Sequence, residues 1–329
     1  MLSTSLALFI FSLQCVLVSR CQGTMPPVTV EKITEPSKLG EGPYWDADKK
    51  VLYFVDVGSN RVHKYDPATR TLKSLTLDGV TFIIPVKGEA DKFVISMYRD
   101  VVLMTWDGES SEPAALEVIA TVHDEDGSRD NRINDAKADA AGTLWAGTLG
   151  PIVNNEVTPE KGILFSLAKD RSTKTHVTKI SISNGFAWSP DSKTMYYIDS
   201  ATGKIDAFDF DITESKIGNR RTVFNFKENG VEGLPDGQTI DTDGNLWVAC
   251  FGGKQVIQVD PRTGRLLRRV EIPALNVTSV VWGGAGLDEL LVTTASSGLD
   301  RPEEHPMAGC TFRVTGLGAR GLPAQSVVL

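Results

Sequence analysis

The chain has 329 residues, of which 41% are hydrophobic and 23% are charged, a composition typical of globular proteins. All-β folds can form one domain of this length, so we expect a single folded domain. The formal net charge of −8 and the pI near 5.2 disfavour a nucleic-acid partner, because such binding depends on Lys and Arg side chains that release counterions from phosphates.

The chain begins with an almost continuous apolar run, Leu6–Val18. This run is shorter than the roughly 20 apolar residues of a membrane-spanning helix, and Cys21-Gln22-Gly23 offers small residues at a cleavage site. We therefore expect residues 1–23 to be a signal peptide, 24–329 to form the folded domain, and the protein to be secreted. A buried strand is an alternative interpretation of the run, and translation from Met25 would give a cytoplasmic form.

Cysteine and histidine provide no metal-binding pattern. Once the signal peptide is removed, Cys250 and Cys310 are the one possible disulfide pair, and their geometry cannot be judged from the sequence. The sequon Asn276-Val277-Thr278 is a glycosylation site only if the chain is secreted. The four histidines occur in unrelated contexts and are expected on the surface or in the core: His63, His123, His176 and His305.

Several short segments share one design, in which an acidic or Gly turn precedes a β-type apolar run. They are 48–56 (DKKVLYFVD), 91–97 (DKFVISM), 142–148 (GTLWAGT), 191–199 (DSKTMYYID), 244–250 (GNLWVAC) and 288–294 (DELLVTT). Their spacing of roughly 43 to 53 residues is close to the period of a four-stranded propeller blade. Further short β segments that stop near Asp, Pro or Gly lie between them. Six such units predict an all-β, six-bladed β-propeller.

The two ends of the domain are expected to share a blade, because an open ring would expose unpaired strand edges. The strand-like segments 28–33 and 311–314 are the candidates. The large aromatic residues of the repeats are expected to pack between neighbouring blades. They are Trp145, Trp247, Tyr53 and Tyr196.

Four motifs place a carboxylate or carboxamide a few residues upstream of a repeated strand. They are Gly40-Glu41-Gly42-Pro43, Arg132-Ile133-Asn134-Asp135, Ser183-Asn184-Gly185 and Leu234-Pro235-Asp236-Gly237. Loops and strand starts of a propeller converge on its central channel. Convergence of Glu41, Asn184 and Asp236 would give an oxygen site for one divalent metal, namely Ca²⁺, Mg²⁺, Mn²⁺ or Zn²⁺.

The alternative interpretation is that Asp and Asn beside Gly simply form turns, and it is the better one for any single motif. The recurrence of four motifs at equivalent places weakens this alternative. Asp241-Thr242-Asp243-Gly244, by contrast, is interpreted as a blade turn and not as a calcium loop, because the Glu that ends such a loop is absent.

At these motifs the chain resembles the regucalcin and gluconolactonase family over essentially the whole of 24–329. The stretches that carry the resemblance are GEGPYWD from Gly40, RINDAKAD from Arg132, SNGFAWSPD from Ser183, YYIDS from Tyr196, PDGQTIDTDGNLWVACFGG from Pro235 and VTGLG from Val314. Two stretches, FIIP from Phe82 and PDGQTID, look most similar to insect members described as luciferin-regenerating enzymes.

The resemblance implies a metal held by Glu41, Asn184 and Asp236, with Asp236 also acting in proton transfer. It further implies that Arg132 and Asn134 bind a small-molecule substrate. Two departures weaken the case for a sugar-acid lactone: the family's NDGK is NDAK from Asn134, and its acidic substrate contact falls near Ile152.

The expected function is a metal-dependent hydrolase that opens a small-molecule lactone. A divalent metal polarises an ester carbonyl and lowers the pKa of bound water, while a carboxylate accepts the proton. The alternatives are an enzyme that acts on oxyluciferin and a calcium-binding or carrier protein without turnover. No membrane or nucleic-acid partner is expected, and the sequence leaves the oligomeric state open.

Overall fold

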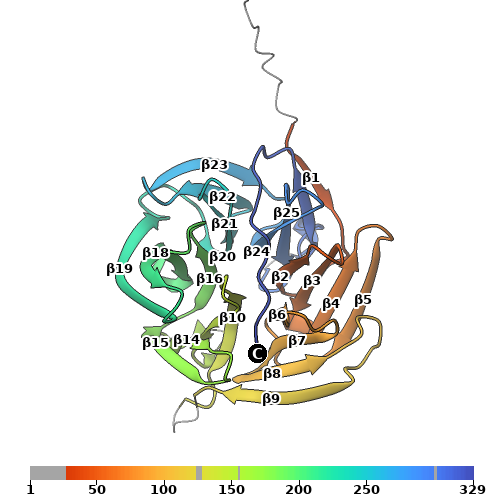
Figure 1. Ribbon diagram of the computed structural model, residues 1–329. Coiled ribbons are helices and arrows are strands. Elements are labelled where there is room, and N and C mark those ends of the chain that lie inside the picture. Colours follow the sequence, from red (N-terminus) through yellow and green to blue (C-terminus); the bar gives the residue numbers. More distant parts are fainter. Residues whose placement is uncertain (1–26, 124–127, 155, 300–301) are drawn as a thin grey trace, which may run out of the picture.

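The computed structural model describes residues 27–123, 128–154, 156–299 and 302–329. Within these residues, the strands form six four-stranded antiparallel sheets arranged as blades around a common axis (Figure 1). The six-bladed β-propeller predicted from the repeats is confirmed. The predicted signal peptide, residues 1–23, and Met25 lie outside the described residues, so the predicted domain boundary at residue 24 stays a prediction.

Each blade runs from an innermost strand at the axis to an outermost strand at the rim. Blades 1 and 2 are β2 (Gly40–Asp46), β3 (Val51–Asp56), β4 (Arg61–Asp66), β5 (Thr71–Thr76), and β6 (Ile83–Pro85), β7 (Lys92–Met97), β8 (Asp100–Thr105), β9 (Ala115–Thr121). Blades 3 and 4 are β10 (Arg132–Ala138), β11 (Leu144–Leu149), β14 (Gly162–Leu167), β15 (Thr173–Ile180), and β16 (Ser183–Trp188), β17 (Thr194–Asp199), β18 (Lys204–Asp211), β19 (Lys216–Asn225). Blade 5 is β20 (Leu234–Ile240), β21 (Leu246–Phe251), β22 (Gln255–Asp260) and β23 (Arg265–Glu271).

Blade 6 contains strands from both ends of the described chain. From the axis outward it is β24 (Asn276–Gly283), β25 (Glu289–Ala295), β26 (Phe312–Thr315) and β1 (Thr29–Lys32). β1 pairs with β26 in register from Thr29 opposite Thr315 to Lys32 opposite Phe312. The predicted closure is confirmed, and it leaves no blade with an unpaired edge at the junction.

The repeated sequence segments all form the second strand of a blade: β3, β7, β11, β17, β21 and β25. These strands are buried on both faces, as in β3 and β11, where every residue is buried. This double burial explains why the segments are nearly continuous apolar runs. The aromatic residues predicted for the core are also buried, and Trp247 packs edge-to-face against Trp282 of the next blade with ring centroids 5.3 Å apart.

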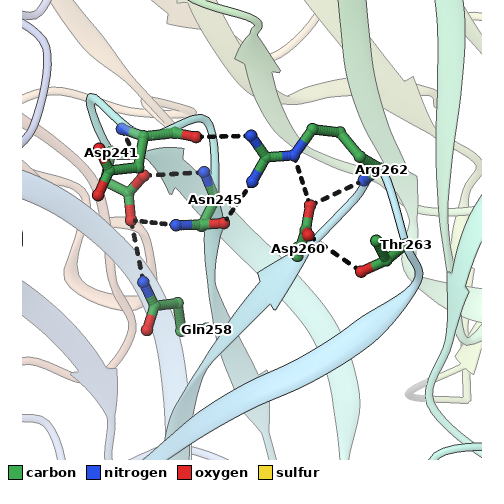
Figure 2. A network of polar contacts seen from close by, with 7 residues as sticks. Asp241, Asn245, Gln258, Asp260, Arg262 and Thr263 are labelled. Atoms are coloured by element: carbon green, nitrogen blue, oxygen red, sulfur yellow. Dashed lines mark hydrogen bonds and ion pairs between the residues drawn. The ribbon is translucent and has the colours of Figure 1, made fainter.

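The turn after β20 is built around a buried carboxylate (Figure 2). Asp241 accepts hydrogen bonds from the Asn245 backbone N (2.8 Å), Trp247 Nε1 (2.9 Å) and Gln258 Nε2 (3.0 Å). Arg262 extends the network outward, donating to Asn245 Oδ1 at 3.1 Å. Protein donors therefore surround Asp241, and its interpretation as part of a blade turn agrees with this geometry.

The last residues, 316–329, cross the middle of the propeller, and we call them the C-terminal strap (Figure 1). At blade 5, Thr242 donates its backbone N–H to Arg320 O at 2.8 Å. At blade 2, Val327 forms a parallel bridge with Val86. The strap is therefore tied at both ends and passes over one mouth of the axis.

Cys250 and Cys310 are both free and buried, so the possible disulfide does not form in this structure. The sequon is also inaccessible, because Asn276 is buried in β24 and donates to Ser297 O at 3.1 Å. Among the described residues, no helix has the length and hydrophobicity required to span a bilayer.

Candidate active site

The three predicted metal ligands lie in the first halves of innermost strands, at interruptions of the β ladder. The register shifts directly after Glu41 in β2 and directly after Asn184 in β16. In β20 the shift contains Asp236, between Pro235 and Gln238. A bulge leaves residues out of the ladder and redirects their side chains. The three side chains thus share one structural setting, although they are far apart in the sequence.

Glycines allow the innermost strands to approach each other at this level. A Cβ atom on Gly185 would lie 2.7 Å from Asp236 O and 2.8 Å from Gln238 N, too close for any other residue. Gly42, which follows Glu41, has a φ of +53°, a conformation that favours glycine. The Gly that follows each candidate ligand in the sequence therefore serves strand packing and backbone conformation.

A hydrogen-bond chain orients the Asn184 carboxamide. Asn134 Nδ2 donates to Asn184 Oδ1 at 3.1 Å, and Asn184 Nδ2 donates to Ser200 Oγ at 2.8 Å. Ser200, in the 3₁₀ helix η2 (Ser200–Thr202), donates in turn to Pro235 O at 2.6 Å. A carboxamide oxygen has two lone pairs, so Asn184 Oδ1 keeps one for a cation.

The carboxylates of this region influence each other's ionisation. Burial raises the pKa of Glu41 to about 8, although the residue is only partly buried, and the nearby Asp135 carboxylate adds to the shift. Burial, followed by the charges of Glu41 and Asp135, raises the pKa of Asp236 well above its usual range. A bound cation would reduce the repulsion between such like charges in a space that holds little water.

The donor set fits one divalent cation. It consists of two carboxylates, Glu41 and Asp236, and the carboxamide of Asn184; no cluster of three or more His, Cys, Asp and Glu side chains able to hold a metal occurs in the part of the chain that the structure describes. Asp236 Oδ1 is buried and has no hydrogen-bond partner. Such hard oxygen donors suit Ca²⁺, Mg²⁺ or Mn²⁺. The assignment of these ligands stays a prediction.

The two predicted substrate residues lie at the start of β10. Arg132 lines a cavity of about 420 Å³ together with Tyr98 and Ile152, and its Nε is buried without a partner. Burial lowers the pKa of this guanidinium. Asn134 uses its Nδ2 group for Ser183 O (2.8 Å) and for Asn184. Only the Oδ1 acceptor of Asn134 is therefore available to a substrate.

Sequence reasoning gave no role to Asp135 and Lys137, which also lie in this channel. Lys137 Nζ donates to Gln238 O at 2.7 Å and Phe186 O at 3.1 Å, and burial lowers its pKa to about 8. Burial raises the pKa of Asp135 to about 6. Strand alternation would place Asn134 and Lys137 on opposite faces, but the register shift between Ile133 and Asp135 alters that pattern. The positions of Asp135 and Lys137 could therefore be predicted only with knowledge of this bulge.

Comparison with known proteins places this geometry in a family. Residues 39–296 match the SMP-30/Gluconolactonase/LRE-like region. Regucalcin of Gallus gallus is 36% identical over 304 residues, which cover 91% of this chain and 98% of the relative. Regucalcin of Homo sapiens is 36% identical over 298 residues, covering 89% and 96% respectively.

A solved structure of a luciferin-regenerating enzyme is 41% identical, with a TM-score of 0.87, and covers 92% of this chain and 100% of that chain. A regucalcin structure from Agrobacterium tumefaciens, at 24% identity and a TM-score of 0.80, covers 91% and 97% and supports the fold. With the propeller and the full-length relatives in agreement, the chain belongs to the SMP-30/gluconolactonase/LRE-like family.

Proposed function

We propose that the protein is a metal-dependent hydrolase that opens a small-molecule lactone. The observation that carries this proposal is the pair of carboxylates from different blades, Glu41 and Asp236. Burial and the charge of Asp135 raise the pKa values of both, and the charge of Glu41 raises that of Asp236 further. Beside them, the Asn184 carboxamide is held in a fixed orientation by Asn134 and Ser200. Family membership supports lactone opening as the reaction class.

In this proposal, Glu41, Asn184 and Asp236 hold one divalent cation. When bound, the cation supplies a Lewis acid and lowers the pKa of water. Asp236 accepts the proton of the attacking water through its unpaired Oδ1 and returns it to the leaving oxygen, so that water adds across the ester bond. Arg132 Nε donates to a substrate oxygen, and Asn134 Oδ1 accepts from a substrate hydroxyl.

The lining of the proposed substrate pocket is largely polar, including Arg99, Asp100, Arg129 and Asp130, but part of its rim is apolar. Ile152, which lines the cavity of Arg132, is 48% exposed, and its neighbour Val153 is 57% exposed. Both belong to a hairpin of β12 (Ile152–Val153) and β13 (Glu156–Val157) that extends from blade 3. This rim favours a lactone with an apolar substituent over a polyhydroxylated sugar-acid lactone.

A second candidate function is the conversion of oxyluciferin. It is favoured by the 41% identity to a protein named luciferin-regenerating enzyme and by the apolar position of Ile152. A third candidate, a calcium-binding or carrier protein without turnover, rests on the name of the regucalcin relatives.

The test is turnover of a lactone panel by the purified protein, first stripped with a chelator and then reloaded with Ca²⁺, Mg²⁺, Mn²⁺ or Zn²⁺. The panel pairs each sugar-acid lactone with an alkyl-substituted lactone of the same ring size, and oxyluciferin is assayed in parallel. We expect metal-dependent acid release that is larger for the alkyl member. Metal binding without acid release from any lactone would contradict a lactonase and support the carrier alternative.

Secretion after removal of residues 1–23 is also proposed, on the sequence pattern alone. N-terminal sequencing of material from the culture medium should begin near Thr24. Protein found only inside cells and beginning at Met25 would contradict this.

A further inference from the structure

A second cavity lies in the channel, on the side of the C-terminal strap. Its volume is about 300 Å³, and none of the three candidate metal ligands lines it. Its walls include residues of all six innermost strands, and residues Leu322–Gln325 of the strap also line it. The cavity shares no lining residue with the pocket of Arg132, and it adjoins the candidate metal ligands through Asp135, whose charge acts on Glu41 and Asp236.

The wall of this cavity is mainly apolar, with one polar end. Apolar side chains from different blades line it, among them Phe82, Trp188 and Ala138. Polar residues also line it. We call Asp135, Lys137 and Gln238 the polar end, where Lys137 Nζ donates to Gln238 O at 2.7 Å; the other polar lining residues include Ser189, Ser192, Thr239, Ser279 and Gln325. Asp135 and Lys137 carry opposite charges, so a neutral ligand would leave that pair balanced, whereas an ionised ligand would add an uncompensated charge.

Two hydrogen-bonding positions at the polar end lack a protein partner. Gln238 is 1% exposed; its Nε2 donates to Gly185 O at 2.9 Å, but its Oε1 is buried and accepts nothing. Lys137 Nζ has three N–H donors, and its two acceptors are the backbone carbonyls of Phe186 and Gln238. A ligand hydroxyl can both donate to Gln238 Oε1 and accept from Lys137, which satisfies both positions at once.

The volume sets the size of the ligand. An apolar cavity of about 150 Å³ is enough to hold benzene, so this space suits a molecule of two fused rings. We propose that this cavity is a binding site for a small, neutral bicyclic aromatic alcohol, whose ring system lies among the apolar wall residues and whose hydroxyl contacts Gln238 and Lys137.

The strap determines how the ligand enters. Between its ties at Gly321 and Val327, its contacts with the blades include one from the Tyr44 hydroxyl, which lies 3.0 Å from Ser326 Oγ and donates to Ala324 O at 3.4 Å. A segment held at both ends and only lightly in between can bow outward without unfolding a blade. The ligand would enter beneath it.

Calorimetric titration of the full chain with 2-naphthol tests the proposal, with naphthalene as the matched probe that lacks the hydroxyl. We expect one equivalent of 2-naphthol to bind, about tenfold more tightly than naphthalene. Gln238→Met should remove this difference and leave naphthalene affinity unchanged. Ala138→Leu, which fills the cavity, should abolish binding of both probes.

Failure of wild type to bind 2-naphthol at about 1 mM would overturn the proposal. Binding that survives Ala138→Leu in a folded variant would place the ligand elsewhere and would overturn it too. If Ala138→Leu does not fold, the test is the ratio of the affinities for 2-naphthol and naphthalene, measured on wild type and on Gln238→Met. A ratio that is the same in both proteins would contradict the proposed site. The titration is repeated after chelation and with Asp236→Asn; unchanged 2-naphthol binding there separates this site from the proposed lactonase.

Discussion

The two ends of β20 carry buried aspartates with opposite surroundings. Asp241, just after the strand, accepts hydrogen bonds from the backbone N–H groups of Asp243 and Asn245 and from the Trp247 side chain. It also accepts one from Gln258 Nε2 (Figure 2). Asp236, near the start of the strand, has a buried Oδ1 that accepts nothing. Both side chains are almost completely buried, at 1% and 6% exposure respectively.

We propose that this difference separates a structural carboxylate, Asp241, from a ligand-binding one, Asp236. Burying a charge is costly unless protein groups satisfy it, as they do around Asp241. Around Asp236, the neighbours are Glu41 and Asp135, which raise its pKa and do not compensate its charge. Substitutions at the two ends of β20 should therefore differ in effect, on function at Asp236 and on stability at Asp241.

The largest effect is expected from Asp236→Asn. The substitution keeps the shape and an oxygen ligand but removes the negative charge and the proton acceptor. Turnover of a confirmed lactone should fall by roughly 10² to 10⁴, and the thermal midpoint of the metal-free protein should not fall. Steady-state kinetics at saturating metal and a thermal melt test both statements. Wild-type turnover would transfer the proton role to another group, with Glu41 the first candidate.

At the other end of the strand, Asp241→Ala should act on stability. It leaves Trp247 Nε1 and Gln258 Nε2 buried without their acceptor, at about 1 to 3 kcal/mol each. Denaturant unfolding should show a loss of about 3 kcal/mol, while the kinetic constants of the folded fraction stay at wild-type values. A variant with normal stability and impaired turnover would reverse the roles given to the two aspartates.

Arg132→Ala tests the substrate side of the site. The substitution removes Arg132 Nε, a buried donor without a protein partner. The kcat/KM should fall by roughly 10- to 100-fold, the effect expected when one charge-assisted hydrogen bond to the substrate is lost. Metal affinity should change little, because Arg132 is not among the candidate ligands. The matched control is Arg262→Ala in blade 5. Loss of metal from the Arg132 variant would show that its role is assigned wrongly.

The pH dependence of metal affinity follows from Glu41. Its pKa is raised from 4.5 to about 8, so in the metal-free protein it retains its proton at pH values where the unfolded chain has lost it. The metal-free protein should therefore lose stability as pH rises from about 4.5 to about 8. Metal displaces this proton, so its affinity should rise by at least roughly tenfold per pH unit below pH 8, and more steeply where Asp236, whose pKa is also raised, loses its own proton. Calorimetry at pH 6, 7 and 8 measures the slope, and a flat profile would exclude Glu41 as a ligand.

The smallest effect is expected from Arg262→Ala, which alters only the exposed edge of the Asp241 network. Arg262 Nε lies 2.7 Å from Asp260 Oδ1, but its side chain is 60% exposed. Exposed pairs of this kind contribute about 0 to 1 kcal/mol. Denaturant unfolding should show a change in this range. A loss as large as that of Asp241→Ala would mean that the network depends on its outer edge.

The fold was largely predictable, because second strands buried on both faces repeat as apolar runs that the sequence shows directly, as in Val51–Asp56 and Leu144–Leu149. The closure of blade 6 followed from the same logic, since β1 and β26 must cover an edge. The C-terminal strap could not be predicted, because its path depends on backbone bonds to blades far away in the sequence, such as that of Val327 to Pro85.

The sequence indicated which residues to consider for the candidate site but not their geometry, and their role as ligands stays a prediction. Turn-like motifs beside Gly indicated Glu41, Asn184 and Asp236, and the structure places all three at bulges of innermost strands. The orientation of Asn184 by Asn134 depends on side-chain contacts between blades, which no local pattern encodes. The position of Lys137 could not be predicted either, because the bulge in β10 breaks the alternation of side chains along this strand.

Asp236, near the start of β20, is proposed to bind a cation together with Glu41 and Asn184. The most direct test is calorimetric titration of the chelator-stripped protein with Ca²⁺ and Mn²⁺, comparing wild type, the Glu41→Gln/Asp236→Asn double variant and Arg262→Ala. We predict one ion per chain for wild type and Arg262→Ala, and a loss of affinity of at least roughly 100-fold in the double variant, since each removed carboxylate weakens a hard oxygen site. One ion bound with wild-type affinity by the double variant would contradict the account.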